Sequence, residues 1–179
     1  MQGLSPEAPV VYVGTFSKLL YPGLRIAYMV VPHWASERFG AAIAALQRGG
    51  QAVEQRALAR FIESGQLTRH TQRMAPLYRH RQQVLRQALR DGLGGTCAIL
   101  GGAAGLHLTL RLPDGPPDRI LVAAAARHGL AVRALSAYFA DGRGDNGLVL
   151  GYGMAEADRI PELVRRLCQA LAEVKEAAL

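Results

Sequence analysis

The stretch VVYVGTFSKLLYPGLRIAYMVV, residues 10–31, decides how this sequence folds. Val10 to Thr15 is β-branched and apolar throughout, as in a short buried strand, and Leu24 to Val31 is mostly apolar, as in a second strand. A Pro-Gly pair between the two runs marks a turn. Lys18 therefore lies between two strands that we expect to belong to one sheet.

A lysine directly after a buried strand is suited to hold a cofactor covalently. Its amine must be neutral to attack a carbonyl, which requires a positioned and dry site. Thr15 and Ser17 offer hydroxyls just before Lys18, and Arg25 offers a guanidinium seven residues after it. These groups are suited to bind a phosphate. We predict that Lys18 holds a cofactor as a Schiff base, and we favour this over an ordinary lysine in a surface loop.

After residue 31 the periodicity of apolar residues changes once, from helices alone to strands mixed with helices. Helical periodicity comes first, at residues 35–47, 52–64 and 67–89, with Gly65 expected to end the second helix and Asp91-Gly92 the third. Strands are then expected at 97–100, 106–112, 130–135 and 148–152, with helices at 118–128 and 160–174. This order predicts an α/β protein in which an α+β unit follows a fragment of a sheet. The two N-terminal strands need cover and neighbours, so we expect the chain to lack the first half of its domain.

Composition narrows the class of protein. The chain has 179 residues, half of them hydrophobic, which suits one domain or a piece of a larger one. We expect no membrane span and no signal peptide, and therefore a cytoplasmic protein. Cys97 and Cys168 have no metal-binding spacing, so we expect two buried thiols, no disulfide and no metal site.

One predicted helix, 67–89, is basic and carries no acidic residue. With the residue that follows it, it contains Arg69, His70, Arg73, Arg79, His80, Arg81, Arg86 and Arg90. A solvated face, or arginines that pair with another part of the protein, is the interpretation we favour. The alternative is a nucleic-acid patch, although no DNA-reading motif accompanies it.

Residues 11–28 resemble the lysine-bearing segment of fold-type I aminotransferases. They are closest to MocR-type transcriptional regulators of the GntR family, in which a winged-helix DNA-binding module precedes an aminotransferase-like domain. The resemblance continues to the C-terminus, at residues 52–78, 104–115, 135–139 and 147–153.

The resemblance implies a cofactor and a set of partners. It implies that Lys18 carries pyridoxal 5'-phosphate, that Thr15 and Arg25 bind its phosphate, and that Ser17 belongs to the motif. It also implies a homodimer, a small amine or amino acid as ligand, and DNA binding only through an N-terminal module outside this chain. The expected division is residues 1–66 from the large domain, a connecting helix at 67–90 and a small domain at 91–179.

The sequence also departs from the family. The resemblance places the family's aspartate for the pyridine nitrogen and the other ring contacts before the lysine, outside this chain. In aminotransferases the last strand carries an arginine for the substrate carboxylate, and Val149 stands at that position. Arg133 and Arg143 are possible replacements. Tyr138 and His107 are possible cleft residues, although core packing and partial exposure are as compatible with them.

Three functions remain open from the sequence. The chain is either an effector-sensing domain with little turnover, a catalytic aminotransferase in which Lys18 also acts as general base, or a remnant with the fold and no activity. The regulator-like segments and Val149 favour the effector-sensing domain.

Overall fold

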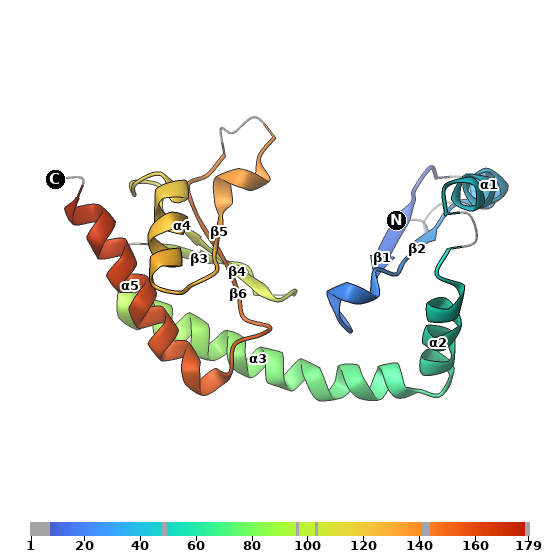
Figure 1. Cartoon of the computed structure of the whole chain (residues 1–179), viewed down its shortest axis with the longest axis horizontal. Coiled ribbons are helices and arrows are strands. Elements are labelled where there is room, and N and C mark those ends of the chain that lie inside the picture. The colour runs from blue at the N-terminus through green and yellow to red at the C-terminus, as the bar shows by residue number, and fades with distance from the viewer. Residues whose placement is uncertain (1–7, 48–49, 96, 103, 141–143, 178–179) are drawn as a thin grey trace. The chain divides into compact units, whose positions relative to one another are not determined.

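The computed structural model describes residues 8–47, 50–95, 97–102, 104–140 and 144–177 (Figure 1). The chain divides into two compact units, Met1–Gln72 and Arg73–Leu179. The division falls inside one long helix, α3 (Gln66–Leu93). Our division at residues 1–66, 67–90 and 91–179 remains a prediction, and the two units are described separately below.

The first unit is built on a two-stranded antiparallel sheet. β1 (Tyr12–Thr15) pairs with β2 (Ala27–Val30), with Thr15 opposite Ala27. Lys18 does lie between two strands of one sheet, as predicted. β2 begins three residues later than expected, because a 3-10 turn, η2 (Pro22–Leu24), takes up the start of the predicted strand.

This sheet is not buried within the described part of the chain. Val13 on β1 is 62% exposed and Val30 on β2 is 47% exposed. Two strands cannot cover their own faces. Apolar side chains that the sequence predicts to be buried therefore remain in contact with water. The expectation that these strands need cover from other elements agrees with this exposure.

Helices follow the sheet much as the periodicity predicts. A 3-10 turn, η3 (His33–Ala35), leads into α1 (Ser36–Gln47), and α2 (Ala52–Glu63) ends before Gly65, whose φ of 71° is left-handed as expected. None of the helices in the described ranges is long and apolar enough to cross a bilayer.

The expected end of α3 at Asp91-Gly92 is wrong. The helix continues to Leu93 and ends at Gly94, which has a φ of 59° and donates its N–H to the Arg90 carbonyl. Gly92 stays helical for a packing reason, because a Cβ there would lie 2.8 Å from the Cys168 sulfur. Gly92 lets two helices approach each other closely. From sequence alone, the same glycine is interpreted as the end of a helix.

The second unit is a four-stranded antiparallel sheet covered by helices. The strand order is β3-β4-β6-β5, formed by β3 (Ala98–Leu100), β4 (His107–Arg111), β6 (Gly147–Gly151) and β5 (Arg133–Ala134). The strand predicted at 130–135 is reduced to two residues. A 3-10 turn, η4 (Leu135–Tyr138), replaces its end because Asp118 accepts the Ser136 N–H at 2.8 Å.

The core lies between one face of this sheet and three helices, α3, α4 (Asp118–Arg127) and α5 (Ile160–Glu176). Leu108, Leu110 and Leu148 are fully buried, while His107 and Thr109 point to the other face, as the period of two predicts. Each buried leucine contributes about 1.5–3 kcal/mol. This unit therefore carries a core of its own.

The two cysteines are free and half-buried rather than fully buried. Cys97 and Cys168 both pack against the core cluster. Burial raises the pKa of each thiol, which disfavours the reactive thiolate.

Candidate functional site

The turn that carries Lys18 is closed by backbone hydrogen bonds at both ends. Phe16 N–H donates to the Ile26 carbonyl at 3.1 Å, and Leu20 N–H donates to the Phe16 carbonyl at 2.8 Å. Lys18 lies at the tip of this turn with its side chain exposed. The sheet thus fixes the position of the lysine backbone and leaves the amine accessible.

Thr15, at the end of β1, orders the start of the turn. Its Oγ1 accepts the Ser17 N–H at 3.2 Å. A hydroxyl that accepts one bond still has its own O–H to donate. The Thr15 hydroxyl therefore helps to shape the turn and can still donate to an anion beside Lys18.

Arg25 has an unusual backbone. Its φ of 50° and ψ of 31° are left-handed, and within the described ranges it is the one residue other than glycine with a positive φ. Such a conformation costs about 1–3 kcal/mol, and strain of this kind gathers at functional sites. The Arg25 N–H closes η2 by donating to the Pro22 carbonyl.

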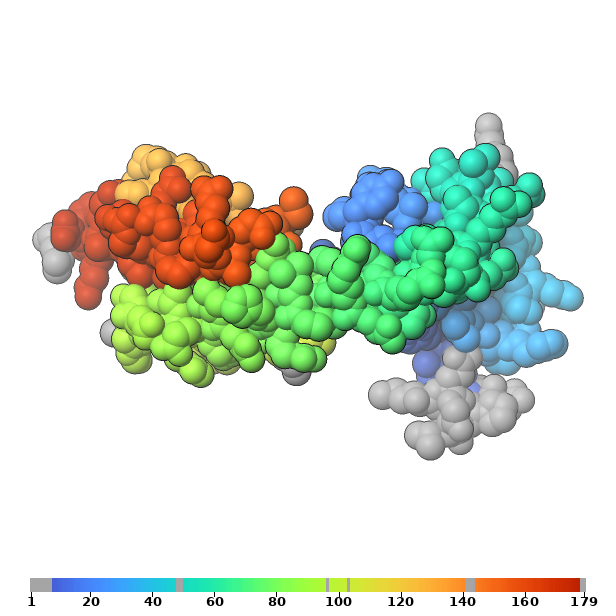
Figure 2. Space-filling model, turned by 90° about the horizontal axis from the view of Figure 1, so that it is seen from below, coloured from blue at the N-terminus to red at the C-terminus, as the bar shows by residue number. Residues whose placement is uncertain are grey.

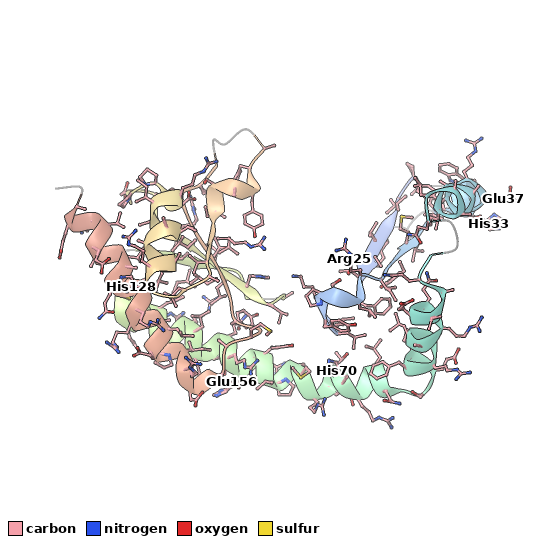
Figure 3. All side chains as sticks on the ribbon, in the orientation of Figure 1. Arg25, His33, Glu37, His70, His128 and Glu156 are labelled. Carbon is pink, nitrogen blue, oxygen red and sulfur yellow. The ribbon has the colours of Figure 1, made fainter. Side chains whose placement is uncertain are left out.

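The Arg25 guanidinium is exposed, and no described residue forms a hydrogen bond or ion pair with it. Figure 3 shows the side chain leaving the end of the β1–β2 pair. All five N–H donors are therefore available to a ligand, and a guanidinium can hold two phosphate oxygens at once. The structure thus brings the four predicted residues, Lys18, Thr15, Ser17 and Arg25, to one end of one small sheet.

His70 is a site residue that no sequence pattern indicated. Its Nε2 lies 3.0 Å from the Leu19 carbonyl, across 51 residues of sequence, so the first turns of α3 are tied to the Lys18 turn (Figure 3). A carbonyl accepts only, so Nε2 carries the proton of this bond. The sequence showed His70 only as part of a basic helix, and no spacing rule links it to residue 19.

The Gly14 position explains the aromatic residues beside the turn. Gly14 pairs with Tyr28, and a Cβ on Gly14 would lie 2.3 Å from the Tyr28 ring. The ring also contacts Tyr12 and Phe16, at centroid distances of 6.0 and 5.6 Å. A hydrogen bond with Tyr12 raises the pKa of the Tyr28 phenol. Glycine at position 14 thus lets an aromatic cover form over β1 next to Lys18.

In the second unit, the predicted replacement arginine lies beside Val149. Arg133 on β5 is directly opposite Val149 on β6, so the two side chains share the open face of the sheet. Arg133 is exposed, and none of the described residues pairs with its guanidinium. Arg143, the other possible replacement, lies outside the described residues. Tyr138 is 59% exposed, which excludes core packing within this unit.

Asp118 fixes the segment that carries Tyr138. The buried carboxylate accepts the Ser136 N–H at 2.8 Å, the Ser136 hydroxyl at 2.7 Å and the Gly147 N–H at 3.3 Å. Burial alone would raise the pKa of Asp118, but these hydrogen bonds outweigh it and hold the pKa below its usual value. Asn146 completes the network by accepting the Asp118 N–H at 2.8 Å.

Two of the arginines of α3 turn inward. Arg81 is buried and donates to the Gly153 carbonyl at 2.7 Å and to the Glu156 carboxylate at 2.8 Å. Arg86 donates to the carbonyls of Ile99 and Gly101. These two residues fit the interpretation that the arginines pair with other parts of the protein.

Comparison with known proteins finds similar sequences among transcriptional regulators. No family model matches the chain. The chain is 38% identical over 159 residues to the uncharacterised HTH-type transcriptional regulator YhdI of Bacillus subtilis, covering 88% of this chain and 34% of that protein. It is 33% identical to the probable rhizopine catabolism regulatory protein MocR of Rhizobium meliloti, covering 95% of this chain and 34% of that protein.

The fold matches solved aminotransferases. LysN, the α-aminoadipate aminotransferase of Thermus thermophilus, superposes with a TM-score of 0.85 at 27% identity, covering 94% of this chain and 43% of LysN. The chain has the fold of the fold-type I aminotransferases and is similar in sequence to transcriptional regulators such as YhdI and MocR. It spans about a third of the length of the MocR-type relatives that it matches.

Proposed function

We propose that this chain is the ligand-sensing part of a cytoplasmic, MocR-type transcriptional regulator, and that it holds pyridoxal 5'-phosphate through Lys18. The observation that carries the proposal is the Lys18 turn, with a strained Arg25 whose guanidinium has no partner among the described residues. The similarity to YhdI and MocR supports a regulator, and the solved LysN structure contains a phosphopyridoxyl-leucine ligand.

The residues present fit one end of this cofactor. A phosphate needs donors and positive charge, and the Thr15 hydroxyl and the Arg25 guanidinium supply both on either side of Lys18. The turn offers no carboxylate for the pyridine nitrogen, because residues 8–36 contain no Asp or Glu. This segment therefore fits the phosphate and the aldehyde, and other parts of a domain would bind the ring.

Each of these residues would have its own part in holding pyridoxal phosphate. When bound, pyridoxal phosphate supplies an aldehyde that reacts with amines. Thr15 and Arg25 would bind and orient the phosphate, and the Lys18 Nζ would hold the cofactor until an amine displaces it. The hydrogen bond of His70 would keep the turn in place meanwhile. Release of Lys18 by an amine or amino acid would be the sensing event.

The partners of the proposed regulator follow from its relatives. We propose that the complete protein is a homodimer and contacts its target DNA through an N-terminal helix-turn-helix module. The name of YhdI, an HTH-type transcriptional regulator, supports the DNA-binding module. The alternative is a catalytic aminotransferase in which the Lys18 Nζ also moves a proton on the substrate, and the fold of LysN favours it. Val149, where a carboxylate-binding arginine is expected, favours the sensor.

The test uses the protein isolated from its natural host. It is loaded with pyridoxal phosphate and mixed with a panel of α-amino acids and simple amines. The proposal predicts a change in cofactor absorbance and in DNA affinity, with little keto acid formed. Rapid keto-acid formation from an ordinary amino acid would establish the enzyme instead.

A further inference from the structure

The solvent side of α3 is unusually basic within the second unit. Taking about 100° per residue, the exposed Arg73, Arg79 and Arg90 lie within about 60° of the direction opposite the buried Leu85. We call these three residues the arginine stripe. Figure 2 shows one side of α3, in green, open to the viewer.

The arginine stripe has one acidic neighbour on its face of α3, Asp91, which lies directly after Arg90. Residues 66–90 contain no Asp or Glu, and the polar residues between the arginines are His80, Gln83 and Gln87. The side chains of the stripe form no hydrogen bond or ion pair with any described residue. Asp91 follows the stripe, but its carboxylate accepts from Gln87 instead.

Several charges on the other helices of this unit are paired. On α5, Arg165 pairs with Glu162, and Glu173 on the same helix pairs with Arg127 of α4 and with His128, which follows α4. Within the described ranges, single unpaired arginines also occur on other elements, such as Arg119 on α4, but the arginine stripe places three on one face of one helix. Between Arg73 and Arg90 the only apolar residue on this described face is Pro76, so the face lacks the large apolar side chains of a protein interface.

We infer that the arginine stripe binds the phosphate backbone of double-stranded DNA without reading its sequence. Arg73 and Arg90 are 17 residues apart, about 26 Å along the helix. At 3.4 Å per base pair this is roughly the length of seven to eight pairs, so three guanidiniums can each reach a phosphate. This inference rests on the proposed function, because a transcriptional regulator is the context that brings this surface to DNA.

The salt dependence sets the size of the expected effect. The logarithm of the affinity falls by about 0.9 per phosphate contact for each tenfold rise in salt, so three contacts give a slope of about 2.7. At about 150 mM salt this corresponds to a loss of roughly a hundredfold when all three contacts are removed.

The experiment measures binding of this chain to a duplex of random sequence by fluorescence anisotropy, between about 50 and 200 mM salt. The variant Arg73→Gln/Arg79→Gln/Arg90→Gln keeps helix propensity. The matched control is Arg56→Gln/Arg119→Gln/Arg159→Gln, which removes the same charge from exposed arginines on other elements. The stripe variant should lose most of the affinity and much of the salt slope, and the control little.

A second measurement locates the contact directly. Phenylglyoxal modification mapped by mass spectrometry should show that the duplex protects Arg73, Arg79 and Arg90 more than the control arginines. Equal weakening by both variants, or no binding at the lowest salt, would overturn the inference. A preference for single-stranded RNA over duplex would do so as well. None of these outcomes alters cofactor labelling of Lys18, so failure here is distinguishable from failure of the proposed function.

Discussion

Arg25→Gly separates the two roles of Arg25, backbone strain and ligand binding. Glycine at this position removes the strain of a left-handed backbone, which raises the free energy of unfolding by about 1–2 kcal/mol. The added freedom of glycine in the unfolded chain lowers it by about 0.4–1 kcal/mol. No described residue pairs with the guanidinium, so nothing else is lost. We expect a net gain in stability of about 0.5–1 kcal/mol together with weaker cofactor binding.

The assay is urea unfolding followed through Trp34, the single tryptophan, which lies in the same unit as Arg25. Gly65→Ala is the matched control, because Gly65 has a φ of 71° and open space where a Cβ would lie. It should cost about 1 kcal/mol, the reverse effect. A loss of stability above about 1 kcal/mol for Arg25→Gly would show that the guanidinium is a structural partner, and unchanged cofactor affinity would show that it is no ligand.

Three further perturbations address named contacts. His70→Ala should slow cofactor labelling of Lys18, and His70→Gln should restore it, since an amide N–H can still reach the Leu19 carbonyl; failure of the rescue would argue against that bond. Asp118 has a lowered pKa, so its stabilisation is present above pH ~4 and is lost as pH falls through the lower folded value. Asp118→Asn should destabilise the second unit by roughly 2–3 kcal/mol at neutral pH and flatten its acid unfolding, as circular dichroism would show. Leu108→Ala should cost about 2–5 kcal/mol in the same unit, and a cost below about 1 kcal/mol would mean that the core is not as tight as its burial indicates.

The sequence predicted correctly those elements whose conformation is decided by residues close to them in the chain. The alternation of His107, Leu108 and Thr109 indicated the correct faces of β4, and Gly65 indicated the correct end of α2. The four residues around Lys18 were found by spacing, because a short hairpin brings residues close in sequence close in space.

The errors arose where distant residues decide the conformation. The end of the strand predicted at 130–135 depends on Asp118, which accepts the Ser136 N–H from another element. Gly92 was interpreted as the end of α3, but it lies within the helix, where Cys168 leaves no room for a Cβ. The bond between His70 and the Leu19 carbonyl joins residues 51 apart. None of these contacts leaves a periodic signal in the sequence.

The most direct test of the central claim is the site of cofactor attachment. The chain is incubated with pyridoxal phosphate, reduced with borohydride, digested and mapped by mass spectrometry. It contains only two lysines, Lys18 and Lys175, so Lys175 serves as an internal control. We predict the phosphopyridoxyl group on Lys18, with labelling reduced in Arg25→Ala. Labelling of Lys175 in preference to Lys18 would contradict this assignment.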